Sequence, residues 1–253
     1  MEKAIIIQAR TGSRRFPNKI LKKIDNRSVL QYLIDKLFKY FDKKEIIIAT
    51  TKSKNDYLIS NVSKFNKIKI FRGSTNNLLE RYLDCSKKYN VKNIIRITSD
   101  CPLVDPKSIN RMYKLFKKKK FDYLSNTCPP ENSKYPDGSD IEIFNYKSLK
   151  KLSKLKQSKE DKEHIYGFWK NENIFKIKTL NRKNDISRFK YSLDYKSDLF
   201  LIKKVVTQLK EKKYSETPEN IIRLIKKDKK LSQISHKNRL KYLENKKFKK
   251  NVL

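Results

Sequence analysis

The chain opens with the apolar run Ala4-Ile5-Ile6-Ile7 and repeats the pattern forty residues later in Ile46-Ile47-Ile48. Continuous apolar runs of this length are typical of parallel strands that are buried on both faces. Between them, residues 28–41 carry apolar side chains at helical spacing, with Ser28 as the expected N-cap. Strand, helix and strand in this order predict a βαβ unit, and hence a parallel sheet.

The same alternation continues outward along the chain. Helical spacing is found in residues 55–65, 77–89 and 105–116, and strand-like runs in 68–71, 93–97, 122–124 and 141–144. The pattern predicts an α/β fold with a mostly parallel central sheet flanked by helices. Beyond Leu149 it weakens to a helix over 162–169, a strand over Phe189–Leu193, a helix over 198–209 and short basic helices from Glu216.

The 253 residues carry a net charge of +36, which suggests a polyanionic partner. Of the 63 basic residues, however, only 12 are arginine, the residue that base and phosphate recognition favours. The lysines are spread along the whole chain, so a tolerant, solvated surface explains them better than nucleic-acid or anionic-membrane binding. No apolar stretch is long enough to span a bilayer and no secretory signal opens the chain, so we expect a cytoplasmic protein.

Chemical motifs are few. With four glycines, neither a G-x-G-x-x-G fingerprint nor a P-loop is present, and the three cysteines and two histidines lack zinc-ligand spacing. The first loop stands out instead, because residues 8–19 gather Arg10, Arg14, Arg15 and Lys19 around Gly12 and Ser13. Basic side chains with backbone N–H groups freed by glycine suit a polyphosphate, and this loop follows the carboxyl end of a strand, where α/β sheets bind ligands.

Residues 7–21 resemble the signature of nucleotide-sugar cytidylyltransferases, which reads close to I-Q-A-R-x-G-S-x-R-L-P-G-K-x-L. The most similar branch is the spore-coat polysaccharide type, related to CMP-KDO and CMP-acylneuraminate synthetases. Phe16 replaces the usual Leu, and Asn18 replaces a Gly, a change that Asn tolerates because it enters the left-handed region readily. Further segments match in order: Phe71-Arg72-Gly73-Ser74, Leu79-Glu80-Arg81-Tyr82, Arg96-Ile97-Thr98-Ser99-Asp100-Cys101-Pro102-Leu103, Tyr123-Leu124-Ser125-Asn126-Thr127, Tyr135-Pro136-Asp137-Gly138-Ser139-Asp140-Ile141-Glu142, Glu163-His164-Ile165 and Ser192-Leu193-Asp194-Tyr195-Lys196-Ser197-Asp198-Leu199.

This resemblance implies a Rossmann-like nucleotide-diphospho-sugar transferase fold and an enzyme that transfers CMP from CTP to a sugar with release of pyrophosphate. It implies Arg10, Lys19 and Asp100 as catalytic residues, and Asp100 with Asp194 as ligands of Mg²⁺. Nucleotide binding would fall to Gln8, Ala9, Arg10, Gly12, Ser13, Arg14, Lys19, Thr50, Arg72, Gly73 and Thr98. Arg15 could as well face solvent, and no residue stands out as a general base.

The acceptor side is less defined. Candidate substrate-binding residues are Asn126, Asp137, Asp140, Glu142 and His164, although Asp140 and Glu142 could also hold a second metal or pair with surface lysines. We expect a catalytic domain over 1–212, with acceptor binding and a candidate dimer interface in 126–180, and a basic helical extension over 213–253. A homodimer follows from the family resemblance alone.

Three readings stay open at this point. The first is a CTP-dependent cytidylyltransferase acting on a KDO-like or nonulosonic acid for surface glycans. The second is a nucleotidyltransferase that takes a sugar-1-phosphate or another phosphorylated alcohol. The third is a protein that binds polyanions on this scaffold, against which the aromatic residues do not interleave with the basic runs as stacking platforms would.

Overall fold

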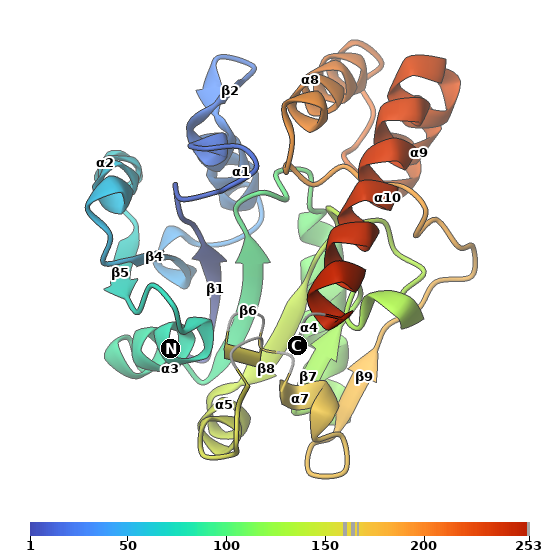
Figure 1. Cartoon of the computed structure of the whole chain (residues 1–253). Helices are drawn as coiled ribbons and strands as arrows, with labels where there is room; N and C mark the ends of the chain where they lie inside the picture. The colour runs from blue at the N-terminus through green and yellow to red at the C-terminus, as the bar shows by residue number, and fades with distance from the viewer. Residues whose placement is uncertain (159–160, 163–164, 166, 252–253) are drawn as a thin grey trace.

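The computed structural model describes residues 1–158, 161–162, 165 and 167–251. Its centre is a seven-stranded sheet in the order β5-β4-β1-β6-β8-β7-β9 (Figure 1). Neighbouring strands are parallel except around β8, which runs antiparallel to both β6 and β7. The mostly parallel α/β sheet is therefore confirmed. The strands are β1 (Lys3–Gln8), β4 (Ile46–Thr51), β5 (Lys69–Gly73), β6 (Asn93–Thr98), β7 (Tyr123–Ser125), β8 (Glu142–Asn145) and β9 (Ile177–Thr179).

Helices cover both faces of this sheet. The predicted N-cap of the first helix is confirmed, because the Ser28 side chain accepts a hydrogen bond from the backbone N–H of Gln31. Pro106 occupies the first turn of α4 behind its cap, Asp105, as the sequence predicts. The helices are α1 (Val29–Phe38), α2 (Tyr57–Asn66), α3 (Leu78–Lys88), α4 (Pro106–Lys119), α5 (Tyr146–Ser153), α7 (Gly167–Lys170), α8 (Lys196–Glu211), α9 (Pro218–Lys227) and α10 (Lys229–Asn251).

The alternating side chains of each strand supply two cores, one on each face of the sheet. On one face, Ile5 and Ile7 of β1 pack with the apolar sides of α1, α2 and α4. On the other face, Ala4 and Ile6 pack with α3, α5 and α7. A strand that is buried on both faces needs apolar residues at every position, which is why the chain reads Ala4-Ile5-Ile6-Ile7 without alternation.

A third core joins the C-terminal helices to the N-terminal half. Residues of α8, α9 and α10 pack with Phe16 of the first loop and Ile24 of a short hairpin formed by β2 (Lys23–Ile24) and β3 (Arg27–Ser28). Lys36 of α1 adds an ion pair with Glu216, at 2.9 Å. Apolar and ionic contacts thus cross residue 212, and the C-terminal helices are packed onto the rest of the chain (Figure 1).

Several predicted elements differ from the structure. The strand over Phe189–Leu193 is wrong: this segment forms a single bridge, between Lys190 and Asp137, and its apolar side chains pack into the third core instead. The short basic helices from Glu216 are two helices, and the second runs for 23 residues. Strand β9 and helix α5 were not predicted, and the helix expected over 162–169 lies in part outside the described residues.

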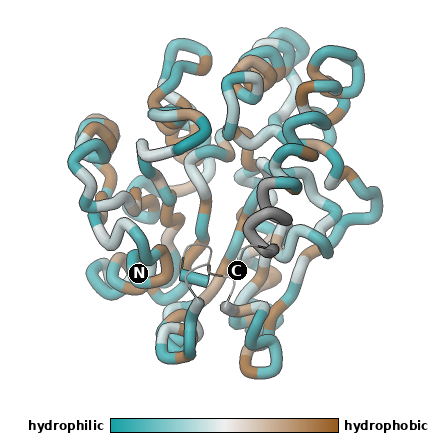
Figure 2. The backbone as a smooth tube through the Cα atoms, viewed as in Figure 1, coloured by the Kyte–Doolittle hydropathy of each residue, from teal (hydrophilic) through white to brown (hydrophobic). Residues whose placement is uncertain are grey.

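Hydrophilic residues are distributed over all the helices and loops (Figure 2). This distribution agrees with the reading of the lysines as a solvated surface. Among the described residues, no helix is long and apolar enough to cross a membrane.

Candidate functional site

Four parallel strands end together at one edge of the sheet. The register pairs Gln8 of β1 with Ala49 of β4 and with Thr98 of β6, and Thr51 of β4 with Gly73 of β5. The chain proceeds from β1 to β4 and β5 on one side, then returns to β6 on the other side of β1. This reversal is a topological switch point, where open α/β sheets bind their ligands.

The loop after β1 is tied to this edge by a buried carboxylate. Asp56, beside the end of β4, accepts hydrogen bonds from the N–H and the hydroxyl of Thr11, both at 2.6 Å, and from the Thr51 hydroxyl. Burial alone would raise the pKa of Asp56, but these hydrogen bonds outweigh it and lower the pKa. At the far end of the loop, Asn18 adopts the left-handed conformation (φ 55°), which confirms the reason for tolerating Asn there.

Between these anchors the loop exposes Arg10, Gly12 and Arg14 to solvent, with Ser13 half-buried. Within the described part of the chain, neither arginine forms an ion pair with a carboxylate. Gly12 has no positive φ, and a Cβ added there would meet open space. The backbone conformation and the neighbouring atoms would therefore both accept a side chain at position 12. The predicted reason for Gly12 that remains is the close approach of a phosphate to the backbone.

The positions expected to surround the base lie at the ends of β4, β5 and β6. Thr50 is fully buried, and Thr98 donates to the sulfur of Cys101 at 3.1 Å. Gly73 has no room for a side chain, since a Cβ would lie 2.5 Å from the Phe71 ring. Arg72 turns away from the strand end and donates to the carbonyls of Thr51 and Ser53, so it braces the loop after β4.

Lys19 lies between two aspartates from opposite parts of the chain. Its Nζ is 2.7 Å from Asp100 Oδ2, just past the end of β6, and 3.0 Å from Asp194 Oδ1, just before α8. Burial disfavours the ammonium, but the two carboxylates outweigh burial and raise the pKa of Lys19. In return Lys19 lowers the pKa of each aspartate, so all three groups are ionised at neutral pH.

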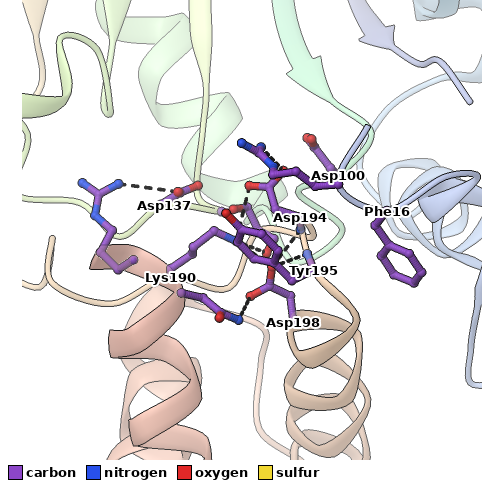
Figure 3. Close-up of polar contacts among 12 residues, drawn as sticks. Phe16, Asp100, Asp137, Lys190, Asp194, Tyr195 and Asp198 are labelled. Atoms are coloured by element: carbon purple, nitrogen blue, oxygen red, sulfur yellow. Dashed lines mark hydrogen bonds and ion pairs between the residues drawn. The ribbon is translucent and has the colours of Figure 1, made fainter. Parts of the chain in front are cut away.

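Asp194 is also held from its other side. Arg15 Nη2 lies 2.7 Å from Asp194 Oδ1, so this arginine, although 40 % exposed, is not free in solvent. Lys190, fully buried, contacts Asp194 Oδ2 at 3.5 Å and Asp198 Oδ2 at 2.9 Å. Asp198 accepts the backbone N–H groups of Asp194 and Tyr195, both at 2.8 Å, and so fixes the turn that presents Asp194 (Figure 3).

The 126–140 loop forms a small cavity beside this cluster. Its walls include Asp137 and Asp140, and α10 contributes Arg239 and Tyr242. Asp140 is fixed by the Thr127 hydroxyl and the Gly138 N–H, both at 2.8 Å. Asn126 also borders this loop, but both ends of its amide bond to the backbone, at Ser139 and Ile141.

Two predicted residues face away from this edge and one cannot be placed. Glu142 lies in the sheet, where its carboxylate binds Arg96 and accepts from the Tyr123 hydroxyl at 2.7 Å. The Gln8 side chain also binds Arg96, with Oε1 2.9 Å from Nη2. His164 lies outside the described residues.

Sequence reasoning missed the residues that hold the site together. Lys190 and Arg239 had no motif to mark them, and Asp56 had only its position after a strand end. Asp198 does follow Asp194 by one helical turn, a spacing that fits a carboxylate capping the first turn of α8. The segment 192–199 that resembles the family also includes Asp198, but the resemblance implies a role only for Asp194.

The donor set near Lys19 fits a divalent cation in part. Among the described residues no three His, Cys, Asp or Glu side chains converge on one point. Asp100 and Asp194 do face a common point, the one that Lys19 Nζ occupies. Mg²⁺ needs only one or two carboxylates when substrate phosphates and waters complete its shell.

A switch-point edge, a basic loop and two facing aspartates suit an α/β protein that binds a phosphorylated ligand. The model of the cytidylyltransferase family matches residues 4–250. The chain therefore belongs to the cytidylyltransferase family and is a nucleotidyltransferase.

Individual relatives agree with this assignment. The chain is 28% identical over 207 residues to the spore coat polysaccharide biosynthesis protein SpsF of Bacillus subtilis, covering 78% of this chain and 83% of that protein. A cytidylyltransferase of Leptospira borgpetersenii has a similar structure, with a TM-score of 0.83, 31% identity, and coverage of 91% and 96% of the two chains.

A more distant structure shares the fold alone. It is a CMP:2-keto-3-deoxy-manno-octonic acid synthetase complexed with CTP, with a TM-score of 0.62, 14% identity, and coverage of 82% of this chain and 99% of that one. The expected nucleotide-diphospho-sugar transferase fold is thereby confirmed.

Proposed function

We propose that this protein transfers CMP from CTP to a sugar acid, with release of pyrophosphate, for the synthesis of a surface polysaccharide. The observation that carries the proposal is Lys19 held between Asp100 and Asp194, in a loop whose Arg10 and Arg14 form no ion pair with any carboxylate of the described residues. Asp100 and Asp194 supply paired carboxylates for a cation, and the loop after β1 supplies positive charge for a triphosphate.

The triphosphate would lie along the loop after β1. Arg10 and Arg14 are exposed there, and the Asp56–Thr11 hydrogen bonds hold the loop backbone in place before any ligand binds. A cradle that is already ordered loses less conformational entropy on binding. Gly12 would let the phosphates approach the backbone closely.

Asp100 and Asp194 would hold Mg²⁺ between them and the phosphates. When bound, the ion supplies positive charge that neutralises the phosphate oxygens. Lys19 already links the same two carboxylates, so its ammonium is placed to contact a phosphate as well.

The reaction itself asks little covalent work of the chain. The acceptor hydroxyl oxygen attacks the α-phosphorus, the bond from that phosphorus to the pyrophosphate oxygen breaks in line, and the hydroxyl proton passes to solvent. Arg10, Arg14 and Lys19 would position the phosphates and stabilise the charge that develops on the departing pyrophosphate. Positioning and electrostatic stabilisation dominate transfers of this kind.

Two of the three similar proteins support a sugar as the acceptor, and one of these two supports a sugar acid. One is a spore coat polysaccharide protein and the other a synthetase for the CMP derivative of a keto-deoxy sugar acid. The cavity of the 126–140 loop lies beside the Asp100 cluster, with Cys101 Sγ 3.5 Å from Asp140 Oδ2, and so offers a place for the acceptor.

Pyrophosphate release tests the proposal. The purified protein is incubated with Mg²⁺ and CTP, UTP, GTP or ATP, each against a panel of keto-deoxy sugar acids, sugar-1-phosphates and phosphorylated alcohols. Release with CTP and a sugar acid, and its loss in EDTA, is the expected result. Release only with another nucleotide, or only with phosphorylated acceptors, would refute the proposal.

A further inference from the structure

The C-terminal helix α10 docks on the site through one of its faces. Ser235 Oγ accepts the backbone N–H of Lys190 and donates to the Lys190 carbonyl, both at 2.9 Å. One turn later, Asn238 donates to Asp198 Oδ1 at 2.7 Å. Both partners belong to the group that surrounds Asp194, so the position of α10 is fixed relative to the candidate metal ligands.

Arg239 follows directly on this anchored face and lines the cavity of the 126–140 loop. Its side chain is only 9 % exposed, and its Nη1 lies 3.5 Å from Asp137 Oδ2 (Figure 3 shows Asp137 beside Lys190 and the Asp194 cluster). A direct charge-assisted hydrogen bond is shorter, at about 2.7–2.9 Å. Arg239 is thus a buried guanidinium that is held near a carboxylate without being tightly bound to it.

The charges around the cavity explain why this arginine matters. Asp137 and Asp140 line the same cavity, and a third carboxylate brought next to them would be repelled. Among the described residues, Arg239 is the one cation that lines it. A guanidinium offers two parallel donors to a carboxylate, so it can both offset the repulsion and set the orientation of an acid.

The cavity itself has room for little more than one water, at about 20 Å³. An acceptor can therefore bind only if Arg239 and Tyr242 shift outward. In this shift the guanidinium exchanges its long contact with Asp137 for a carboxylate of the acceptor.

We propose that Arg239 binds the carboxylate of the acceptor, so that α10 forms one wall of the acceptor site and selects sugar acids over neutral sugars. This inference rests on the proposed function, since it assigns the acceptor subsite of the same reaction. It extends that function by giving a substrate-reading role to the helical extension.

The test compares one sugar in two forms, a keto-deoxy sugar acid and its carboxamide, as acceptors for the wild-type protein and for Arg239→Gln. We expect Arg239→Gln to lower kcat/KM for the acid by about 10- to 100-fold, since a hydrogen bond to a charged group is lost. The loss is smaller for the carboxamide than for the acid, and KM for CTP stays unchanged. Arg239→Lys recovers part of the preference for the acid, and Arg223→Gln, an exposed arginine on α9, matches the wild type.

Other outcomes overturn the inference. Equal loss of turnover for acid and carboxamide means that Arg239 only supports the position of α10, and an unchanged preference means that it does not contact the acceptor. A rise in melting temperature with CTP shows that a variant is folded and binds the nucleotide. If Arg239→Gln lacks this rise, the acid preference of Arg239→Lys is measured in its place. No preference for the acid in Arg239→Lys also overturns the inference.

The proposed function is judged separately, in the wild-type arm. If no sugar acid is turned over there, the same acids are tested for thermal stabilisation of both proteins in the presence of CTP. An acid that stabilises the wild type but not Arg239→Gln upholds the carboxylate site even though the proposed reaction fails. Equal effects on both proteins overturn the site.

Discussion

Two basic regions of this protein differ in whether their positive charges are paired with carboxylates. In the loop after β1, Arg10 and Arg14 face solvent, and within the described chain no carboxylate pairs with them. Around Asp194, Arg15, Lys19 and Lys190 are each within 3.5 Å of that single aspartate. The first region carries positive charge that only a ligand can neutralise, whereas the second is neutralised by the protein itself.

The difference teaches what each region can do. An unpaired arginine on an ordered loop binds an anion without first breaking a contact. A buried cluster of paired charges is costly to disturb, because removal of one partner leaves another buried and uncompensated. Ligands of the cluster must therefore exchange for existing partners, as a cation would for Lys19 or an acid for Asp137. Four substitutions test this contrast.

The largest effect is expected from Lys190→Met. This change removes the buried cation of Asp198 and one of the three cations around Asp194, and we expect the free energy of unfolding to fall by about 3–5 kcal/mol. Urea unfolding measures it. The matched control is Lys203→Met, an exposed lysine on α8, which should change stability by less than about 0.5 kcal/mol. A small loss of unfolding free energy in Lys190→Met would contradict the contrast between the two regions, because the stability of the cluster would then not depend on its internal ion pairs.

Asp100→Asn comes next. It keeps the shape of the side chain but removes the charge that faces Lys19, and we expect kcat for pyrophosphate release to drop by about 100- to 1000-fold. The unfolding midpoint should move little, since the Asp100 side chain is 30 % exposed. Asp84→Asn, on the exposed side of α3, serves as the control. Full activity in Asp100→Asn would remove this aspartate from the reaction.

Asp137 gives a prediction about pH. Burial raises the pKa of Asp137 to about 6, and the charges of Asp140 and Asp194 add to this while Lys190 and Arg239 oppose it. A carboxyl whose folded pKa is raised destabilises the protein above that pKa, and the penalty disappears as the pH falls toward the unfolded value of 3.8. Asp137→Asn removes the penalty.

Relative to the wild type, Asp137→Asn should therefore be more stable at pH 7 than at pH 4, by about 2–3 kcal/mol at 1.36 kcal/mol for each pKa unit. Denaturant unfolding at pH 4, 5, 6 and 7 follows the difference. The pKa of Asp194 is lowered, so Asp194 stays ionised over this range and adds no pH dependence to the stability difference. A difference that is constant with pH would contradict the raised pKa.

The smallest effect is expected in the open region. Arg14→Gln removes one phosphate contact, and we expect KM for CTP to rise about 10-fold with no change in the unfolding midpoint. The rise should shrink at high salt, because exposed charges are screened. Arg188→Gln, another exposed arginine, is the control. If Arg14→Gln were to destabilise the fold instead, the loop would be a paired region like the cluster.

The sequence predicted the sheet well because buried strands and amphipathic helices leave local patterns. Ile5 to Ile7 and Ser28 needed no knowledge of distant residues. The predicted strand over Phe189–Leu193 is wrong because its pattern depends on distant residues. Its alternating apolar side chains pack against α8 and α9 and do not pair in a sheet. Strand β9 has three residues, too few for a period to show.

The candidate site was predictable only where a motif carried it. The resemblance named Lys19, Asp100 and Asp194, and the structure places the Lys19 ammonium within 3.0 Å of a carboxylate oxygen of each aspartate. Lys190 and Arg239 were invisible, because one basic residue among 63 carries no signal of burial. Their roles depend on how α10 packs on the rest of the chain, which no local sequence pattern encodes.

The anchoring of α10 also has a consequence for synthesis. Residues 235–239 leave the ribosome after every strand of the sheet, and the C-terminal helices share a core with Phe16 of the first loop, so the packed unit is completed only when they emerge. Ser235, Asn238 and Arg239 then close the acceptor side around Lys190, Asp198 and Asp137. The residues of the proposed acceptor wall are therefore the last part of the site to be synthesised.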